Sequence, residues 1–364
     1  MSRQIATWAG GRWKICSRAM NSPNIERHRF GWLESVCAVA TSLLLTACGG
    51  DSGAPPAPTP PSLTESQRIA AATATAQSAT NACNPIRPFY WEIGDRTAAL
   101  ASGSVELGAG GAPTYTAATS MNIASASKWL YAAYVVQRRG AAGPTAEDVK
   151  FLSFRSGYTN FNLCLSGQTV DGCLATGSNG TYTSANDGLF FYDGGHMQKH
   201  ASLLGLGPLV NAALAAEIRS QLGTDVGLSY SQPQLAGGGI STAADYARFL
   251  RKLLDGTLRL GAQLGRDAVC ASPTACPSQA VSTPIPSTER WDYSIGHWVE
   301  TDPGVGDGAF SSPGAFGFYP WIDVNRSLYG VVARESFLLS AMPSYQSVQC
   351  GRLIRQAWVS GVAR

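Results

Sequence analysis

Residues 120–130 read Ser-Met-Asn-Ile-Ala-Ser-Ala-Ser-Lys-Trp-Leu, and an apolar run through Val136 follows them. This pattern predicts a helix in which Ser125 and Lys128, three positions apart, share one face. At the first helical turn, Ser125 would lie beside free backbone N–H groups and the positive end of the helix dipole. A lysine normally has a pKa of ~10.4, but burial lowers that pKa and leaves a neutral amine able to take the serine proton. The pair is therefore a candidate nucleophile and base.

The Ser-x-x-Lys spacing alone is weak evidence, because an exposed serine at a helix end followed by a solvated lysine has the same pattern. The chain has few lysines, however, namely Lys14, Lys128, Lys150, Lys199 and Lys252. Only Lys128 has a serine three residues before it. The surrounding sequence must decide between the two interpretations.

Residues 1–48 have the features of an export signal. A basic segment precedes an apolar run that is too short to span a membrane permanently. The run ends in Leu45-Thr46-Ala47-Cys48, which resembles the bacterial lipoprotein cleavage box, and this implies a lipid anchor on Cys48. The alternative is an ordinary cleaved signal peptide. We expect a protein of the periplasm or cell envelope, an outer-membrane lipoprotein of a Gram-negative bacterium.

Residues 49–61 are rich in proline and glycine and predict a structureless tether. The folded domain is then expected at residues 62–364, with room for a large core. Charged residues make up 14% of the chain, and the formal net charge is only +3. No basic run follows the signal, so nucleic acid is not expected as a partner.

Six of the nine cysteines fall within the expected domain. Six cysteines allow 15 pairings. Close spacing favours Cys164–Cys173 and Cys270–Cys276, and elimination leaves Cys83–Cys350. Metal binding is the competing interpretation, but the sequence has no C-x-x-C motif.

The local patterns predict an α+β order of elements. A capping box at residues 62–65 opens a helix that ends near residue 80, and a strand pair follows at residues 89–95 and 97–107. The region from about 144 to 288 is expected to be a helical insert, with amphipathic helices at residues 208–222 and 242–254. Strands are then expected at residues 293–299, 315–323 and 328–334, before a last helix that carries Cys350.

This layout resembles the serine β-lactamase and penicillin-binding-protein superfamily, in particular its class C-like esterase and amidase branch. Residues 123–128 are similar to the nucleophile motif of the family, and residues 151–158 are similar to its LL-x-H-T-S-G segment without the His and Thr. Residues 236–250 are similar to a family helix start that contains S-T-A-x-D-x-A-R-F. The resemblance implies an antiparallel sheet flanked by N- and C-terminal helices, with an inserted all-helical subdomain.

The family's second motif is Tyr-x-Asn, and its tyrosine helps the lysine to relay protons. Tyr192-Asp193-Gly194 stands in the expected order, whereas Tyr230 lies too near the segment at residues 236–250. The resemblance therefore implies that Tyr192 is the catalytic tyrosine, although Tyr230 stays open. Gly194 replaces the family's asparagine, so an amide contact to substrate is lost or supplied elsewhere.

The third family motif is Lys-Thr-Gly or a His-x-Gly variant on the strand beside the site. Ser312-Pro313-Gly314-Ala315 stands in that place, and the glycine allows close approach of a substrate. The resemblance implies an oxyanion hole made by the N–H groups of Ser125 and Ala315. Losing the cation argues against typical β-lactam or D-Ala-D-Ala carboxypeptidase chemistry and favours an ester or amide without a carboxylate.

His196 and His200 have the i, i+4 spacing that can hold zinc, but the sequence offers no obvious third ligand. His297 precedes the third motif and would either reach the cleft or fill space. No metal or organic cofactor is implied.

The sequence therefore predicts an exported serine hydrolase that cleaves a small-molecule ester or amide. Ser125 is the nucleophile, Lys128 the base and Tyr192 the proton shuttle. The alternatives are a β-lactamase, a D-Ala-D-Ala carboxypeptidase-like penicillin-binding protein, or a catalytically silent relative that serves as a binding module.

Overall fold

The computed structural model describes residues 63–364 except residues 109, 111, 113 and 338–341. The predicted export signal, with Cys48, and the predicted tether lie outside the described residues. So does Ser62, the first residue of the predicted capping box.

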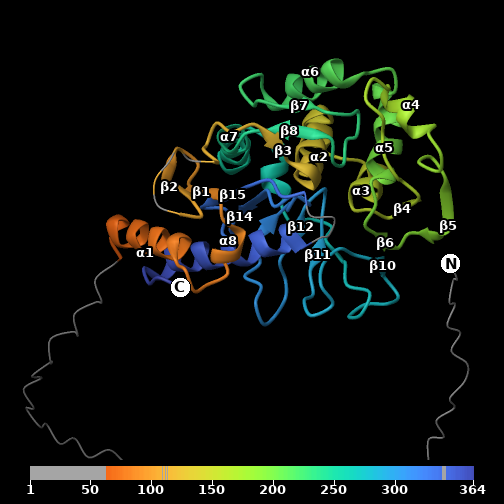
Figure 1. The fold of residues 1–364 in the computed structure, drawn as a ribbon. Coiled ribbons are helices and arrows are strands. Elements are labelled where there is room, and N and C mark those ends of the chain that lie inside the picture. The colour runs from red at the N-terminus through yellow and green to blue at the C-terminus, as the bar shows by residue number, and fades with distance from the viewer. Residues whose placement is uncertain (1–62, 109, 111, 113, 338–341) are drawn as a thin grey trace, which may run out of the picture. The chain divides into compact units, whose positions relative to one another are not determined.

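A single antiparallel sheet forms the centre of the described fold (Figure 1). Its strand order is β2-β1-β15-β14-β13-β12-β11-β9, so β1 from the start of the fold pairs with β15 from near its end. The strands are β1 (Phe89–Gly94), β2 (Ala99–Val105), β9 (Val269–Cys270), β11 (Asp292–Tyr293), β12 (Trp298–Val299), β13 (Phe310–Ser311), β14 (Tyr319–Ile322) and β15 (Tyr329–Ala333).

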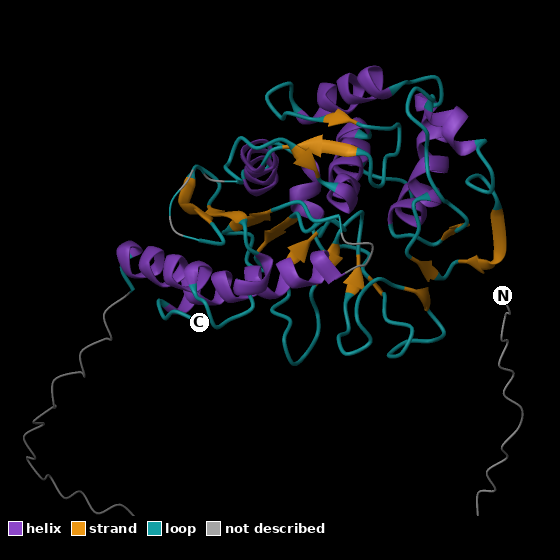
Figure 2. Ribbon diagram, viewed as in Figure 1, coloured by secondary structure: helices purple, strands orange, loops and turns teal. Residues whose placement is uncertain are grey.

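Helices cover both faces of this sheet (Figure 2). On one face α1 (Glu65–Gln77) packs against α8 (Met342–Ser360), which in turn packs on β14 and β15. On the other face α7 (Ala243–Leu254) packs on β1, β14 and β15, and α2 (Ser127–Arg138) lies beside it. Because both faces are covered, β1, β14 and β15 are buried along their whole length instead of alternating between buried and exposed residues.

The expected insert between residues 144 and 288 is not all-helical. Its helices are α3 (Ala146–Leu152), α4 (Val170–Leu174), α5 (Gly195–Ala201), α6 (Asn211–Leu222) and α7, with π-helical and 3₁₀ turns η4 (Ser202–Leu206) and η5 (Arg259–Gln263). Short strands also occur there, namely β4 (Ser156–Tyr158), β5 (Tyr182–Asp187), β6 (Phe190–Phe191), β7 (Ser229–Tyr230), β8 (Gly239–Ser241) and β10 (Ala280–Ser282). These strands make small two- and three-stranded sheets, and β9 joins the main sheet, so the prediction of an all-helical subdomain was wrong in this detail.

Three further predictions about local structure need correction. The capping box that opens α1 is made by Thr64 and Gln67, whose side chains satisfy each other's backbone N–H groups. The strand expected at residues 293–299 is a tight hairpin of β11 and β12, because Ser294 N–H bonds to the His297 carbonyl and closes a turn. The strand expected from Ala315 begins only at Tyr319, because Gly314 and Gly317 form a turn through two backbone hydrogen bonds.

Three disulfides join Cys83 to Cys350, Cys164 to Cys173 and Cys270 to Cys276, the pairs that the spacing favoured. The first fastens the segment between α1 and β1 to the middle of α8. The other two close short loops of the insert and of the edge of the sheet. The first bridge therefore ties the start of the fold to its end.

No single helix among the described residues is long and apolar enough to cross a membrane. The stretches Gly195–Leu206 and Asn211–Leu222 are together long and apolar enough, but the chain bends by 80° at the break between them.

The remaining elements are short and lead into the site. They are β3 (Met121–Asn122), which pairs with β8, and the 3₁₀ turns η1 (Asn84–Ile86), η2 (Ala124–Ala126) and η3 (Gly140–Ala142).

Candidate active site

Ser125 lies in the η2 turn, immediately before α2. The residue before it, Ala124, has a φ of 43°, which places it in the left-handed region that residues with a Cβ seldom occupy. Such a backbone conformation persists only where the surrounding structure enforces it, and it is common at active sites. The turn therefore presents Ser125 at a bend between β3 and α2.

Hydrogen bonds to β8 hold one side of this turn. The Ile123 N–H donates to the Gly239 carbonyl at 3.0 Å, and the Gly239 N–H donates to Ser127 Oγ at 3.1 Å. The Ser127 hydroxyl in turn donates to the Ala124 carbonyl at 2.6 Å. A Cβ on Gly239 would lie only 2.6 Å from Ser127 Oγ, so a glycine is needed at this contact. The segment at residues 236–250, which resembles a helix start of the β-lactamase-like family, thus has a structural role beside the site.

The turn between β13 and β14 holds the other side. Ser312 Oγ donates to the Ser125 carbonyl at 3.1 Å. A Cβ on Gly314 would collide with the Ile123 carbonyl oxygen, so this glycine permits the two segments to touch. Ser312 and Gly314 therefore support the backbone of Ser125, although neither lines the pocket beside it.

Lys128 is buried, with 4% of its surface exposed. Its Nζ donates hydrogen bonds to Ser125 Oγ at 3.0 Å and to the Ala236 carbonyl at 2.7 Å. Burial lowers the pKa of Lys128 to about 7, and the charge of Asp193 opposes this shift. A substantial fraction of Lys128 is therefore neutral at physiological pH, within hydrogen-bonding distance of the serine hydroxyl.

Tyr192 also lies at this pair. Lys128 Nζ is 4.7 Å from the centre of the Tyr192 ring, and the Ser125 side chain lies close enough to the Tyr192 hydroxyl to lower the pKa of that hydroxyl. Burial raises the pKa of Tyr192 to about 12, while hydrogen bonds with Ser125 and Trp298 oppose the rise. The Trp298 ring stacks on the Tyr192 ring at 5.2 Å and fixes its orientation.

Tyr230, the other candidate, is buried in β7. Among the described residues its hydroxyl has no hydrogen-bond partner. The geometry therefore brings together Ser125, Lys128 and Tyr192, and leaves Tyr230 outside this hydrogen-bonded group.

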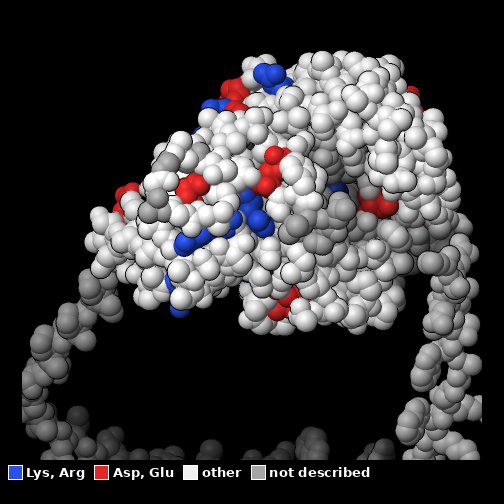
Figure 3. All heavy atoms as spheres, viewed as in Figure 1, with Lys and Arg blue, Asp and Glu red and all other residues white. Residues whose placement is uncertain are grey.

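A pocket of about 370 Å³ opens in front of Ser125. Lys128 is the one charged side chain among its lining residues, and Figure 3 shows how few charged atoms lie on the pictured face of the molecule. The residues that line the pocket are Asn122, Ala124, Ser125, Lys128, Gly194, Ser231, Gln232, Gln234, Ala236, Gly237, Ala315, Phe316 and Phe337. Gly194 and Ala315 are therefore pocket residues, and Ala315 belongs to a turn rather than to a strand.

Sequence reasoning missed two features of this site. Asn122, Gln232 and Gln234 give the wall its side-chain amides. Asn122 directly precedes the nucleophile motif and Gln232 follows Tyr230 by two residues, but neither was predicted to line the site. Asp193, adjacent to Tyr192 in the sequence, is the carboxylate that acts electrostatically on Lys128. The sequence shows Asp193 inside the second motif, but nothing in it indicated where that side chain points.

The histidines of the insert have structural roles. His196 contacts the Ser156 hydroxyl at 2.7 Å and the Phe191 carbonyl at 3.0 Å, so both ring nitrogens are engaged. His200 lies between Tyr131 Oη and Asp148. His297 accepts from the Gly265 N–H and stacks on Trp129 behind α2. The described residues contain no cluster of three or more metal-ligating side chains.

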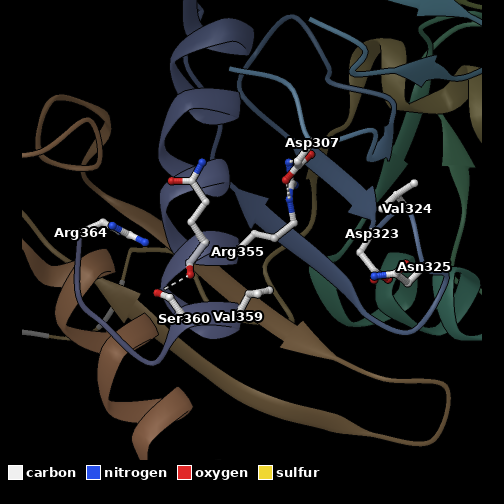
Figure 4. Close-up of a pocket in the computed structure, with 9 residues that line it drawn as sticks. Asp307, Asp323, Val324, Asn325, Arg355, Val359, Ser360 and Arg364 are labelled. Atoms are coloured by element: carbon white, nitrogen blue, oxygen red, sulfur yellow. Dashed lines mark hydrogen bonds and ion pairs between the residues drawn. The ribbon is translucent and has the colours of Figure 1, made fainter. Parts of the chain in front are cut away.

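A second pocket of about 310 Å³ lies beside α8 and does not include Ser125 or Lys128 (Figure 4). Three of its charged side chains, Asp307, Asp323 and Arg355, are already engaged. Arg355 is paired with Asp307 through two hydrogen bonds, and the Asp323 carboxylate accepts from the N–H groups of Ser327 and Leu328. This pocket offers no nucleophile or free base.

Solved structures with a similar fold have low sequence identity to this chain. D-amino acid amidase from Ochrobactrum anthropi SV3, complexed with L-phenylalanine amide, matches 81% of this chain and 99% of its own length, with a TM-score of 0.57 and 12% identity. A penicillin-binding protein from Bacillus halodurans matches 73% and 98%, with a TM-score of 0.51 and 14% identity. A putative beta-lactamase from Bacteroides dorei DSM 17855 matches 74% and 93%, with a TM-score of 0.50 and 19% identity.

No protein-family model and no curated protein matches the sequence. The chain has the fold of the serine β-lactamases and penicillin-binding proteins, as the motif order predicted. At these identities the likeness establishes the fold, and the chemistry must be argued from the residues of the site.

The two serines of the Ser125-Ala126-Ser127 stretch should respond differently to substitution. Ser127→Ala leaves the buried Gly239 N–H without its acceptor, so we expect the free energy of unfolding to fall by about 1–3 kcal/mol. Ser125→Ala, the matched control, removes a hydroxyl that faces the pocket and should change stability little. Urea unfolding of the two variants measures both effects. An equal loss of stability in the two would contradict the bridging role of Ser127.

Proposed function

We propose that the chain is a serine hydrolase in which Ser125 attacks the carbonyl of a neutral ester or amide. The observation that carries this proposal is the 3.0 Å contact between Ser125 Oγ and Lys128 Nζ, because burial lowers the pKa of that lysine to about 7. A hydroxyl with a neutral amine beside it, at the floor of an open pocket, fits the requirement for an activated nucleophile.

Acylation follows from this arrangement. As Ser125 Oγ forms a bond to the substrate carbonyl carbon, its proton passes to Lys128 Nζ. The carbonyl oxygen gains a negative charge, which the N–H groups of Ser125 and Ala315 stabilise from the two segments that meet there. The bond to the leaving group then breaks, and the leaving group takes a proton from the Tyr192 hydroxyl, which Lys128 replenishes.

Deacylation uses the same groups in reverse. Water attacks the acyl-enzyme carbonyl and loses its proton to the Tyr192 and Lys128 pair. Ser125 leaves as the alcohol, and the free acid is released. Both steps need one group that first accepts and later returns a proton, and a lysine with a pKa near neutrality can do both.

The pocket favours an uncharged acyl group. In addition to Lys128, which is committed to Ser125 and Ala236, the wall carries neutral amides and an apolar side formed by Phe316 and Phe337. These two rings lie 5.1 Å apart. Among the described residues that line the pocket, a substrate carboxylate would find no free cation to pair with, and burying it would cost free energy.

The nucleophile and the base can be tested together. A fluorophosphonate probe should label the wild-type protein at Ser125, and Ser125→Ala should remove the label. Lys128→Met should lower kcat/KM for p-nitrophenyl acetate by about 10²- to 10⁴-fold, the usual contribution of a general base. Lys150→Met, which changes a partly exposed lysine, is the control and should retain activity.

The same assay has an expected pH dependence. Lys128 must be neutral to accept the serine proton, so kcat/KM should rise with pH and reach half its plateau near pH 7.

A folded wild-type protein without label on Ser125 would contradict the enzyme proposal and favour the silent binding module.

A pair of substrates tests the charge of the acyl group. A neutral N-acetyl amino acid p-nitrophenyl ester should be cleaved at least about tenfold more efficiently than the matching N-succinyl ester, which carries a carboxylate. Penicillin and a D-amino acid amide should be assayed beside them, since a penicillin-binding protein and a D-amino acid amidase share the fold. A preference for the charged substrates would favour the β-lactamase or carboxypeptidase alternative.

We also propose that the protein is exported and anchored to a membrane of the cell envelope through a lipid on Cys48. Three disulfides support an oxidising compartment. In a Gram-negative host, the full chain should be found with the membranes, and Cys48→Ser should release it or leave it unprocessed. Membrane fractionation with an immunoblot measures this. A Cys48→Ser variant that is processed to the same size and distributed like the wild type would favour the ordinary cleaved signal peptide.

A further inference from the structure

The loop of residues 231–238, between β7 and β8, carries two glutamines that line the pocket in front of Ser125. We call it the glutamine loop. Gln232 Nε2 donates to Gln234 Oε1 at 3.3 Å, so the two side-chain amides lie side by side. Within the described part of the chain, Gln232 Oε1 and Gln234 Nε2 have no hydrogen-bond partner. One acceptor and one donor are therefore free, next to each other, at the pocket wall.

Hydrogen bonds to buried groups hold the glutamine loop in place. The buried side chain of Gln198, from α5, donates to the Pro233 carbonyl at 2.9 Å and accepts from the Leu235 N–H at 3.4 Å. The Ala236 carbonyl, in the same loop, accepts from Lys128 Nζ at 2.7 Å. The loop is thus fixed relative to the base, which reduces the entropy that is lost when its two amides bind a ligand.

The pocket wall also has an aromatic part. Phe316 and Phe337 line it, with ring centres 5.1 Å apart and ring planes inclined at 53°. Phe337 is 65% exposed, and this apolar surface gains free energy when a ligand removes it from water. Phe316 directly follows Ala315, and the Ser336 N–H donates to the Phe316 carbonyl at 2.8 Å. The aromatic pair is therefore held next to the proposed oxyanion hole.

The third amide of the wall, Asn122, has a structural role. Its backbone N–H and its Nδ2 both donate to Glu335 Oε1, at 3.0 and 2.7 Å. Glu335 lies two residues before Phe337, so these hydrogen bonds anchor the segment that carries one of the two rings. Asn122 is thus committed to Glu335, and the glutamine pair is the better match for a ligand.

We propose that the glutamine pair and the aromatic pair recognise one substrate, an ester or amide whose acyl part is an N-acylated aromatic amino acid. This inference rests on the proposed function and names its substrate class. The secondary amide of such an acyl part has one C=O, which accepts from Gln234 Nε2, and one N–H, which donates to Gln232 Oε1. Its ring packs on Phe316 and Phe337, because contacts between aromatic rings are favourable beyond the area that they bury.

Both contacts belong to the acyl part of the substrate. In the proposed mechanism Tyr192 gives a proton to the leaving group. Tyr192 lines a separate small cavity, whereas the glutamine pair and the aromatic pair line the pocket in front of Ser125. The features that we assign to recognition are therefore apart from the residue that serves the leaving group.

Three p-nitrophenyl esters separate the two contacts. The ester of N-acetylphenylalanine has both the ring and the amide, that of 3-phenylpropanoic acid has only the ring, and that of N-acetylalanine has only the amide. Each kcat/KM is divided by the ester's own rate of hydrolysis by hydroxide, because the acetamido group activates the carbonyl. Both enantiomers of the amino acid esters are assayed, and the faster one is compared.

We expect the N-acetylphenylalanine ester to be the best substrate. Its corrected kcat/KM should exceed that of the 3-phenylpropanoyl ester by about 10- to 100-fold, because the latter cannot make the two hydrogen bonds. It should exceed that of the N-acetylalanine ester by about tenfold, because the alanine side chain buries less apolar area and has no ring.

Substitutions then assign each preference to its residues. Gln232→Met combined with Gln234→Met keeps the side-chain size and removes both amides, so the preference for the acetylated over the 3-phenylpropanoyl ester should fall to about twofold or less. Phe337→Ala should reduce the preference for phenylalanine over alanine by about 3- to 10-fold. Gln279→Met changes an exposed glutamine outside the pocket and should alter neither ratio. A variant that is merely damaged would lose activity on all three esters alike and keep both ratios.

The outcomes distinguish this inference from the proposed function. Equal corrected kcat/KM values for the three esters, with fluorophosphonate label on Ser125, would overturn the substrate class and leave the proposed function intact. A preference for the amide that survives unchanged in the double variant would overturn the assignment to Gln232 and Gln234. An absence of label on Ser125 in the folded wild type would overturn the proposed function itself.

Discussion

The attachment of residues 123–128 from two sides is the constraint on which the site depends. Hydrogen bonds through Ser127 and Gly239 join this segment to β8, and Ser312 joins it to the turn after β13. Together these hydrogen bonds enforce the left-handed conformation of Ala124, because an alanine side chain does not itself favour that conformation. The main sheet and the insert therefore meet at Ser125, and the contacts between them both close the fold and orient the nucleophile.

Burial shifts the pKa values of the groups around Lys128 in opposite directions. It lowers the pKa values of Lys128, His196 and His297 and raises that of Tyr192, so each of these groups is driven towards its neutral form. Asp193 opposes this effect only for the lysine. The site is thus built from neutral hydrogen-bonding groups with one adjustable proton, an arrangement that suits carbonyl chemistry on an uncharged substrate.

The predictions from sequence succeeded where local pattern determines structure. The three-residue spacing that lets Lys128 reach Ser125 and the strands at both ends of the chain follow from periodicity, although Ser125 lies in the 3₁₀ turn η2 and the helix α2 begins only at Ser127. The predictions failed where a turn interrupts an apolar run and where loops bring distant residues together. Ala315 looked like part of an apolar strand, but hydrogen bonds of Gly314 and Gly317 make it a turn. Gln232 stands two residues after Tyr230, the alternative catalytic tyrosine, but no local pattern indicated that loops bring Gln232 and Gln234 to the pocket.

The sequence by itself determined that a serine and a lysine lie three residues apart at the start of a helical segment, a spacing that brings their side chains within reach of each other. It also determined the order of the motifs and the favoured cysteine pairs. Only the tertiary structure decided that the lysine is buried, which tyrosine reaches the serine and where the carboxylate of Asp193 lies. These properties depend on desolvation and on distances between segments far apart in the chain, and a one-dimensional pattern does not contain either.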